Sequence, residues 1–151
     1  MSQKIKNALT ELSKYSFILG VVNENKRERK KGQSITNSEL LIIHEFGSPV
    51  RKIPKRPILQ YAIESEWVNK VIEITLNQCV EYVLLNEESK IRPELDKTAM
   101  RIESFIRRSL YNGSHNLKPL SNATVERKGS DLPLFDTGQL ARSIVCQVVK
   151  K

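Results

Sequence analysis

The chain has 151 residues, of which 39% are apolar and 28% are charged. This is the size of one ordinary domain, and it is long enough to bury a core without metal or disulfide staples. We therefore expect a single domain over residues 1–151. The polar N-terminus predicts no signal peptide, and no apolar run approaches the roughly 20 residues that a membrane span needs, which argues against a membrane protein.

The net charge of +8 favours acidic partners, nucleic acid among them, because clustered Lys and Arg bind phosphate. The densest cationic run flanks Gly32 within residues 25–33, which we interpret as a mobile loop or the tip of a hairpin. Its candidate residues for electrostatic contact are Lys26, Arg27, Arg29, Lys30 and Lys31. A solvated loop is the simpler interpretation, and docking to DNA or to an acidic surface is the alternative.

The N-terminal segment predicts a helix followed by a strand. Ile5, Leu9 and Leu12 recur at helical spacing, which indicates a short amphipathic helix over residues 1–14. Residues 15–22 are rich in β-branched and aromatic side chains and predict a strand. Residues 32–35 carry a weaker signal for a partner strand.

A second helix is predicted from its start and stop signals. Thr36 with Glu39 three residues later forms a capping-box pattern before an apolar run that ends at Phe46. Gly47 supplies the left-handed position that terminates such a helix. We expect a short buried helix with a defined end.

A proline-rich segment over residues 50–57 should cross the surface as a stiff extended strap. Pro57 suits the first turn of a helix that can continue to about Glu88. The stripe expected to be buried on this helix contains Tyr61, Ser65, Val68, Ile72, Leu76, Cys79 and Val83.

The same helix carries a second apolar set on nearly the opposite side. These residues are Ile63, Trp67 and Ile74. A helix that is apolar on two sides must bury both, and a chain of this size seldom has enough core to surround it. We therefore predict that this second set is a subunit interface.

Another helix should begin at Pro93 and end near Asn112-Gly113, antiparallel to the first. Its buried stripe is predicted from steps of three and four: Leu95, Ala99, Ile102, Ile106 and Leu110. The polar segment 113–133 is expected to be a loop or arm with one short helix capped by Ser121. After a turn over residues 139–142, residues 144–149 predict a last strand.

The turn before this strand carries the triplet Asp136-Thr137-Gly138, which also occurs in the active-site loop of aspartic proteases. Only 13 residues follow Gly138, which leaves no room for the downstream strands of such a lobe. The centre of the chain is also helical, whereas that fold is almost wholly strand. We interpret Asp136 or Thr137 as a helix cap.

No other catalytic, metal or cofactor pattern is present in the sequence. Neither His44 nor His115 has metal-ligand spacing with Cys79 or Cys146, and both cysteines are expected to be reduced and buried. There is no Gly-x-Ser-x-Gly elbow and no phosphate-binding glycine loop. We therefore expect no enzymatic activity and no cofactor.

Two motifs instead resemble a known family of structural proteins. They are Glu45-Phe46-Gly47, continued by Ile53-Pro54-Lys55-Arg56-Pro57, and residues 134–144, Leu-Phe-Asp-Thr-Gly-Gln-Leu-Ala-Arg-Ser-Ile. In this order, around a helical middle, they resemble the neck and tail-completion proteins of tailed bacteriophages, also called virion morphogenesis or minor tail proteins. The similarity covers roughly residues 17–148. Departures are Ile58, where relatives often have an aromatic residue, and the cationic run.

The resemblance implies an α+β fold in which a small antiparallel sheet packs on two long antiparallel helices. It implies a ring-forming structural subunit, by family analogy a hexamer, that caps the proximal end of the tail and joins it to the head connector. Its partners would be copies of itself, the tail tube or tail terminator and the head connector, with DNA contact in the channel left open. It would reside in the virion, and in the bacterial host cytoplasm during assembly.

Within this resemblance, a set of residues is expected to form structural joints between the elements. They are Phe46, Gly47, Pro54, Arg56, Pro57, Asp136, Thr137 and Gly138. Two other classes of function stay open at this point. A basic nucleic-acid-binding module of a phage or prophage would explain the charge, and a small inhibitor directed at the host is the other.

Overall fold

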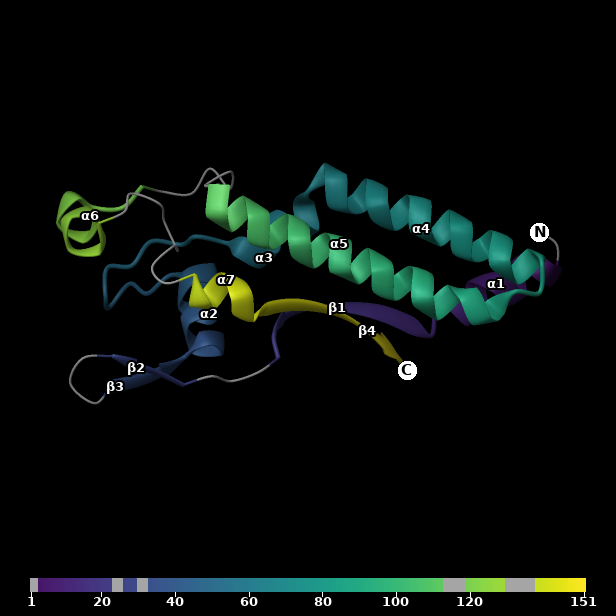
Figure 1. The fold of residues 1–151 in the computed structure, drawn as a ribbon, viewed down its shortest axis with the longest axis horizontal. Helices are drawn as coiled ribbons and strands as arrows, with labels where there is room; N and C mark the ends of the chain where they lie inside the picture. Colours follow the sequence, from purple (N-terminus) through teal and green to yellow (C-terminus); the bar gives the residue numbers. More distant parts are fainter. Residues whose placement is uncertain (1–2, 23–25, 30–32, 113–118, 130–137) are drawn as a thin grey trace. The chain divides into compact units, whose positions relative to one another are not determined.

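The computed structural model describes residues 3–22, 26–29, 33–112, 119–129 and 138–151, which form mostly helices with two small sheets (Figure 1). The helical elements are α1 (Gln3–Leu12), α2 (Asn37–Phe46), α3 (Ile58–Glu64), α4 (Glu66–Leu84), the 3-10 turn η1 (Glu88–Lys90), α5 (Ile91–Asn112), α6 (Asn122–Lys128) and α7 (Gln139–Ser143). The strands are β1 (Tyr15–Val21), β2 (Lys26–Arg29), β3 (Gln33–Thr36) and β4 (Ile144–Lys150).

The chain divides into two compact units. The first contains residues Met1–Leu19, Ile63–Glu103 and Cys146–Lys151, and the second contains Gly20–Ala62 and Ser104–Val145. Helix α5 and the strands β1 and β4 contribute residues to both units.

In the first unit, α4 and α5 form an antiparallel pair side by side (Figure 1). A tight connection through η1 reverses the chain, with Asn86 at a φ of 58°. At mid-length the Oγ1 atoms of Thr75 and Thr98 lie 2.7 Å apart, buried between the helices. All five residues of the predicted α5 stripe are buried, so this prediction is confirmed: Leu95, Ala99, Ile102, Ile106 and Leu110.

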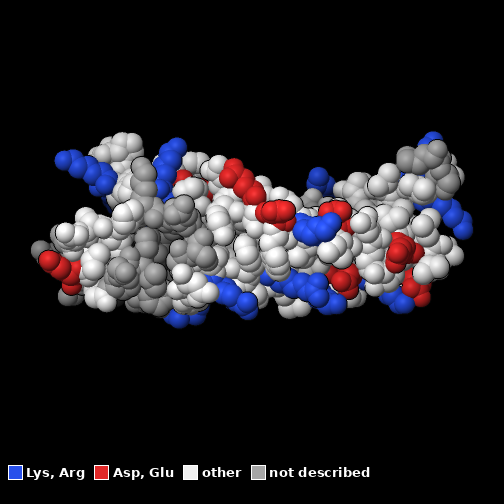
Figure 2. Space-filling view, turned by 90° about the horizontal axis from the view of Figure 1, so that it is seen from above, with Lys and Arg blue, Asp and Glu red and all other residues white. Residues whose placement is uncertain are grey.

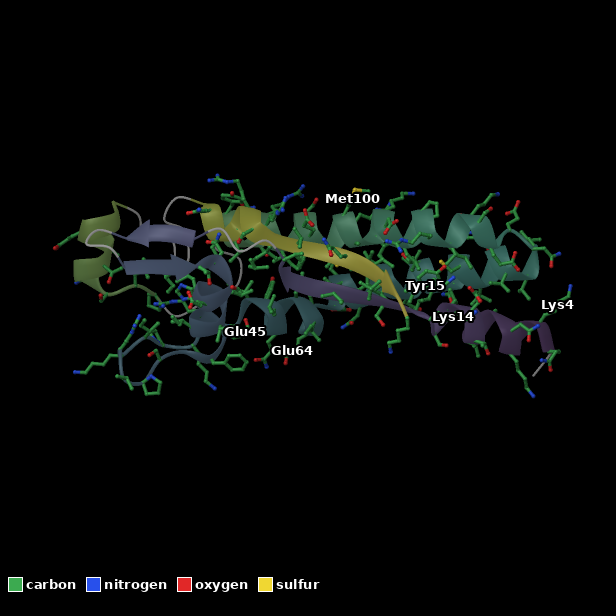
Figure 3. The ribbon with its side chains drawn as sticks, turned by 90° about the horizontal axis from the view of Figure 1, so that it is seen from below. Lys4, Lys14, Tyr15, Glu45, Glu64 and Met100 are labelled. Atoms are coloured by element: carbon green, nitrogen blue, oxygen red, sulfur yellow. The ribbon has the colours of Figure 1, made fainter. Side chains whose placement is uncertain are left out.

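The sheet of β1 and β4 lies along α5 in the same unit. The Lys151 amide, just after β4, donates to the Lys14 carbonyl before β1 at 2.7 Å, so the strands are antiparallel (Figure 3). The Glu103 carboxylate of α5 accepts from the Cys146 amide of β4 at 3.1 Å, which joins sheet to helix. The α+β fold expected from the resemblance is therefore confirmed.

Helix α1 contacts α4, but not through the stripe that the sequence predicted. Ala8 is its fully buried residue, whereas Ile5 and Leu9 are 37% and 49% exposed. The small side chain of Ala8 allows close approach of another element, whereas Ile5 and Leu9 remain partly in contact with solvent. The expected apolar face is thus only partly correct.

The continuous helix predicted from Pro57 to Glu88 is wrong. Ser65 adopts an extended conformation, with φ −66° and ψ 122°, and separates α3 from α4. Its hydroxyl accepts from the Val68 amide at 3.5 Å, which caps α4. Ser65 is therefore a helix cap and not part of a buried stripe, and Ile63 lies on a different helix from Trp67 and Ile74.

The buried face of α4 is also rotated relative to the prediction. Thr75 is only 3% exposed, whereas Leu76, which was expected to be buried, is 40% exposed. Val68 and Cys79 are buried as predicted. As a result, the exposed residues Trp67 and Ile74 lie nearer to the buried face of α4 than the sequence predicted, because they had been expected on nearly the opposite side of the helix.

In the second unit, α2 begins as the sequence predicted. Thr36 Oγ1 accepts from the Glu39 amide at 3.1 Å, and the Glu39 carboxylate accepts from the Thr36 amide at 2.7 Å. This is a complete capping box. Leu40 and Leu41 are buried, but Ile42 is 57% exposed, so the helix is half-buried rather than buried.

The hairpin interpretation applies to part of the cationic run. Lys26–Arg29 form β2, which pairs antiparallel with β3, so this part is a strand and not a loop. Lys30 and Lys31 lie outside the described residues. In the polar arm, α6 begins after Ser121 as expected, but the Ser121 side chain makes no capping hydrogen bond to the helix. Residues 113–118 and 130–137 lie outside the described part.

The end of α5 fastens α7 and β4 within this unit. The Arg107 guanidinium donates to the Arg142 carbonyl at 2.9 Å and to the Ile144 carbonyl at 3.0 and 3.1 Å. The rings of Tyr61 and Phe105 stack at a centroid distance of 6.2 Å. These contacts join α5 to α3 and to the last helix and strand.

Both cysteines are free and buried, as predicted. Burial raises the pKa of each thiol to about 11, with smaller effects from Glu94 on Cys79 and from Glu103 on Cys146. Thiols with such pKa values carry little thiolate at neutral pH and are poor nucleophiles.

The buried threonine pair leads to an asymmetric prediction. Thr75 already donates to the Val71 carbonyl at 2.9 Å, so the Thr98 hydroxyl must be the donor between them. Thr75→Val should leave that hydroxyl without its acceptor and lower the free energy of unfolding by about 1–3 kcal/mol. Thr98→Val removes only a donor and should cost less than about 1 kcal/mol.

Chemical denaturation of the two single variants and the double variant measures this difference. The double variant should lose little more stability than Thr98→Val alone, because no buried donor is then orphaned. Equal losses in the two single variants would contradict the assigned donor direction.

Candidate structural joint and exposed faces

The connection from α2 to α3 is built around Gly47. Its φ is 75° and its ψ is 179°, so it does not adopt the left-handed helical conformation expected from the sequence. This combination is open almost only to glycine. A Cβ atom at this position would lie 3.0 Å from the Ile53 carbonyl oxygen and 3.1 Å from the Lys55 amide nitrogen. Gly47 therefore ends α2 through an extended turn pressed against the following segment.

Beyond Gly47 the chain closes a small loop. Ser48 and Ile53 exchange two backbone hydrogen bonds of 2.9 Å, and the Lys52 amide donates to the Pro49 carbonyl at 3.1 Å. Residues 49–52 therefore form a tight turn, and the extended strap predicted over 50–57 is correct only for its last residues. Pro54 and Pro57 lie in this extended part.

The Glu45 carboxylate holds the start of α3. One of its oxygens accepts from the amides of Ile58 and Leu59 at 2.7 and 3.0 Å, and the other accepts from the Gln60 amide at 2.9 Å (Figure 3). The first amides of a helix have no partner within it, and its N-terminus favours a negative charge. A side chain near the end of α2 thus caps the next helix, a role that the sequence analysis missed.

Arg56 completes the joint from the opposite direction. Its amide donates to the His44 carbonyl at 2.7 Å, and its guanidinium donates to the Pro119 carbonyl at 3.3 Å. The side chain is 6% exposed, and burial lowers the pKa of the guanidinium. The segment 44–60 is thus tied to itself and to residue 119. We call residues 44–60 the joint.

The second predicted motif is described only from Gly138 onward. Gly138 is the N-cap of α7 with φ 68° and ψ 4°, a left-handed conformation. A Cβ atom here would lie 3.0 Å from the Tyr111 hydroxyl oxygen. Asp136 and Thr137 lie outside the described residues, so their capping role stays a prediction.

The contacts of the joint position backbone segments relative to one another. Within the described residues no group of three or more His, Cys, Asp or Glu side chains could hold a metal ion. Two charged groups of the joint, Glu45 and Arg56, are engaged with backbone amides and carbonyls. What the joint can do is orient α3 relative to α2.

The joint carries an exposed apolar surface on its outside. A shallow groove there is lined by Phe46, Gly47, Ser48, Pro49, Lys52, Ile53, Pro54 and Lys55. Phe46 is 66% exposed and Val50 is 95% exposed. The helix that ends at Phe46 was predicted to be buried, so its exposed end differs from that prediction.

The residues predicted as a subunit interface are exposed in the isolated chain. Ile63 is 67% exposed, Trp67 is 44% exposed and Ile74 is 56% exposed. Trp67 and Ile74 lie two turns apart on one side of α4. On the face seen in Figure 2, acidic and basic side chains are interspersed.

No family model matches the chain, and neither a curated protein nor a solved structure matches it. In the part of the chain that is described, no helix is long and apolar enough to cross a membrane. The function must therefore be argued from the joint and from the exposed faces.

Substitution of Gly47 tests the backbone of the joint. Gly47→Ala should lower the free energy of unfolding by more than about 2 kcal/mol, because strain of about 1–3 kcal/mol adds to a clash with backbone atoms. Gly129→Ala is the control, since Gly129 also has a positive φ, of 68°, but nothing lies within 4 Å of the added Cβ atom. Thermal or denaturant unfolding measures both, and equal losses would contradict the close approach at Gly47.

Substitution of Glu45 tests the cap of α3. Glu45→Ala should lower the free energy of unfolding by about 2–3 kcal/mol, because three amides lose a charged acceptor. Glu45→Gln keeps one acceptor oxygen, so its loss of unfolding free energy should be smaller than that of Glu45→Ala. Glu88→Ala removes an exposed carboxylate and serves as the control. If Glu45→Ala unfolds like this control, the cap contributes nothing.

Proposed function

We propose that this chain is a structural virion protein, a ring-forming neck or tail-completion subunit of a tailed bacteriophage. In this function it caps the proximal end of the tail and joins it to the head connector. Its partners are copies of itself, the tail tube or tail terminator and the connector. The protein is then located in the virion, and in the host cytoplasm during assembly.

The main support for the proposal is that hydrogen bonds join the two halves of the first motif, residues 45–47 and residues 53–57 with the helix that follows them. Glu45, from Glu45-Phe46-Gly47, caps the helix that follows Pro57, and the Arg56 amide returns to the carbonyl of His44. The motif residues that carry the family resemblance therefore have a shared physical task. They set the direction between two helices, as an assembly part requires.

The exposed apolar side chains support the same proposal. Single exposed apolar residues are ordinary on protein surfaces. Several large ones, such as Trp67, Phe46 and Val50, carry a free-energy cost while their apolar surface stays in contact with water. Association with other subunits would cover them. The proposal thus accounts for features that a monomeric binding module leaves without a role.

The assembly state tests the proposal directly. Sedimentation at several protein concentrations, followed by negative-stain imaging, should show rings. A monomer at every concentration that is retained on DNA in a salt-dependent manner would instead favour the basic nucleic-acid-binding module.

Substitution of Trp67 tests the predicted interface. Trp67→Ala should weaken association by about 2 kcal/mol or more, roughly thirtyfold in the dissociation constant, because buried aromatic residues dominate interfaces. Met100→Ala is the control, since Met100 is 61% exposed on α5 (Figure 3) and outside the predicted interface. A Trp67 variant that unfolds much earlier as a monomer but associates normally would place Trp67 in the core.

A further inference from the structure

The outside of the joint is apolar and positively charged. Its groove is lined by Phe46, Pro49 and Pro54 among others, and Val50, which follows Pro49 in the chain, is almost fully exposed. Its exposed charged residues are Arg51, Lys52 and Lys55, and no Asp or Glu occurs between residues 46 and 57. We call this surface the basic joint face.

The region around Trp67 is apolar and negatively charged. Ile63, Trp67 and Ile74 are exposed there. Residues 63–74 contain three exposed carboxylates, Glu64, Glu66 and Glu73, and one Lys, which pairs with Glu73 at 3.0 Å. We call this surface the acidic helix face.

Like faces of two copies would repel each other. If two basic joint faces met, Lys and Arg side chains would oppose one another without carboxylates, and two acidic helix faces would place Glu against Glu. Juxtaposed like charges across an interface cost affinity, whereas complementary charges guide and orient association. Each apolar face therefore fits the other better than it fits itself.

We infer that the basic joint face of one copy binds the acidic helix face of the next copy. Such a contact is heterologous, because it joins two different surfaces, and repetition of it closes a ring when the rotation between copies permits. The inference rests on the proposed ring assembly and specifies which surfaces build it. Phe46 and Val50 of one copy then cover Trp67 and Ile74 of its neighbour.

Paired charge reversals test this arrangement. The joint variant carries Lys52→Glu and Lys55→Glu, and the helix variant carries Glu66→Lys and Glu73→Lys. All four positions are exposed, so the folded chain should tolerate the changes, which circular dichroism and melting can verify. Each variant alone then has two faces of the same sign and should associate at least tenfold more weakly than the wild type.

An equal mixture of the two variants gives the decisive result. Each face then meets an oppositely charged face on the other variant, so an alternating assembly of wild-type size should return by sedimentation velocity. A variant that carries all four reversals should also assemble, since its charges are exchanged between the faces. If the mixture formed only dimers, the contact would join the same face of both copies, and the inference would be wrong.

Two further outcomes separate the inference from the function on which it rests. If the wild type forms rings and both variants form them equally well, these faces are not the contact, and the proposed function stands without the inference. If the wild type stays monomeric at all concentrations, both the ring assembly and the inference are wrong.

Discussion

The three hydrogen bonds from the Glu45 carboxylate to the start of α3 are the constraint on which the joint depends. Helix α3 has only seven residues, and a helix of this length is not stable by itself in water. Because its cap comes from the end of α2, the two helices cannot change direction independently. Gly47 makes the cap reachable, since a side chain there would collide with the returning segment. Arg56 then closes the connection from the other side.

A rigid joint with exposed apolar side chains suits a part that is completed by its neighbours. The monomer buries the α5 stripe well, yet it leaves large apolar residues such as Phe46, Val50 and Trp67 in contact with water. The same turn that fixes the end of α2 also presents Val50 outward. The two backbone hydrogen bonds between Ser48 and Ile53 close the turn, and Val50, at the tip of this turn, is therefore exposed to solvent. This link is why we argue function from assembly rather than from catalysis.

The distribution of charge refines what the net charge of +8 suggested. Short segments differ in sign, since the turn at residues 48–55 is cationic and the corner at residues 63–74 is acidic. The face seen in Figure 2 carries interspersed charges of both signs, as ordinary solvated protein surfaces do. Much of the excess positive charge lies in the run of residues 26–31, of which Lys30 and Lys31 fall outside the described residues.

The sequence by itself determined the elements whose signals are local. The capping box of Thr36 and Glu39, the strands at both ends and the buried stripe of α5 follow from spacings of two to four residues. Tertiary structure decided the features whose partners lie further away. The burial of Thr75 in place of Leu76 depends on how α4 meets α5, and Glu45 acts on amides 13 to 15 residues later. Periodicity carries no information about such contacts, because only the folded chain brings their two sides together.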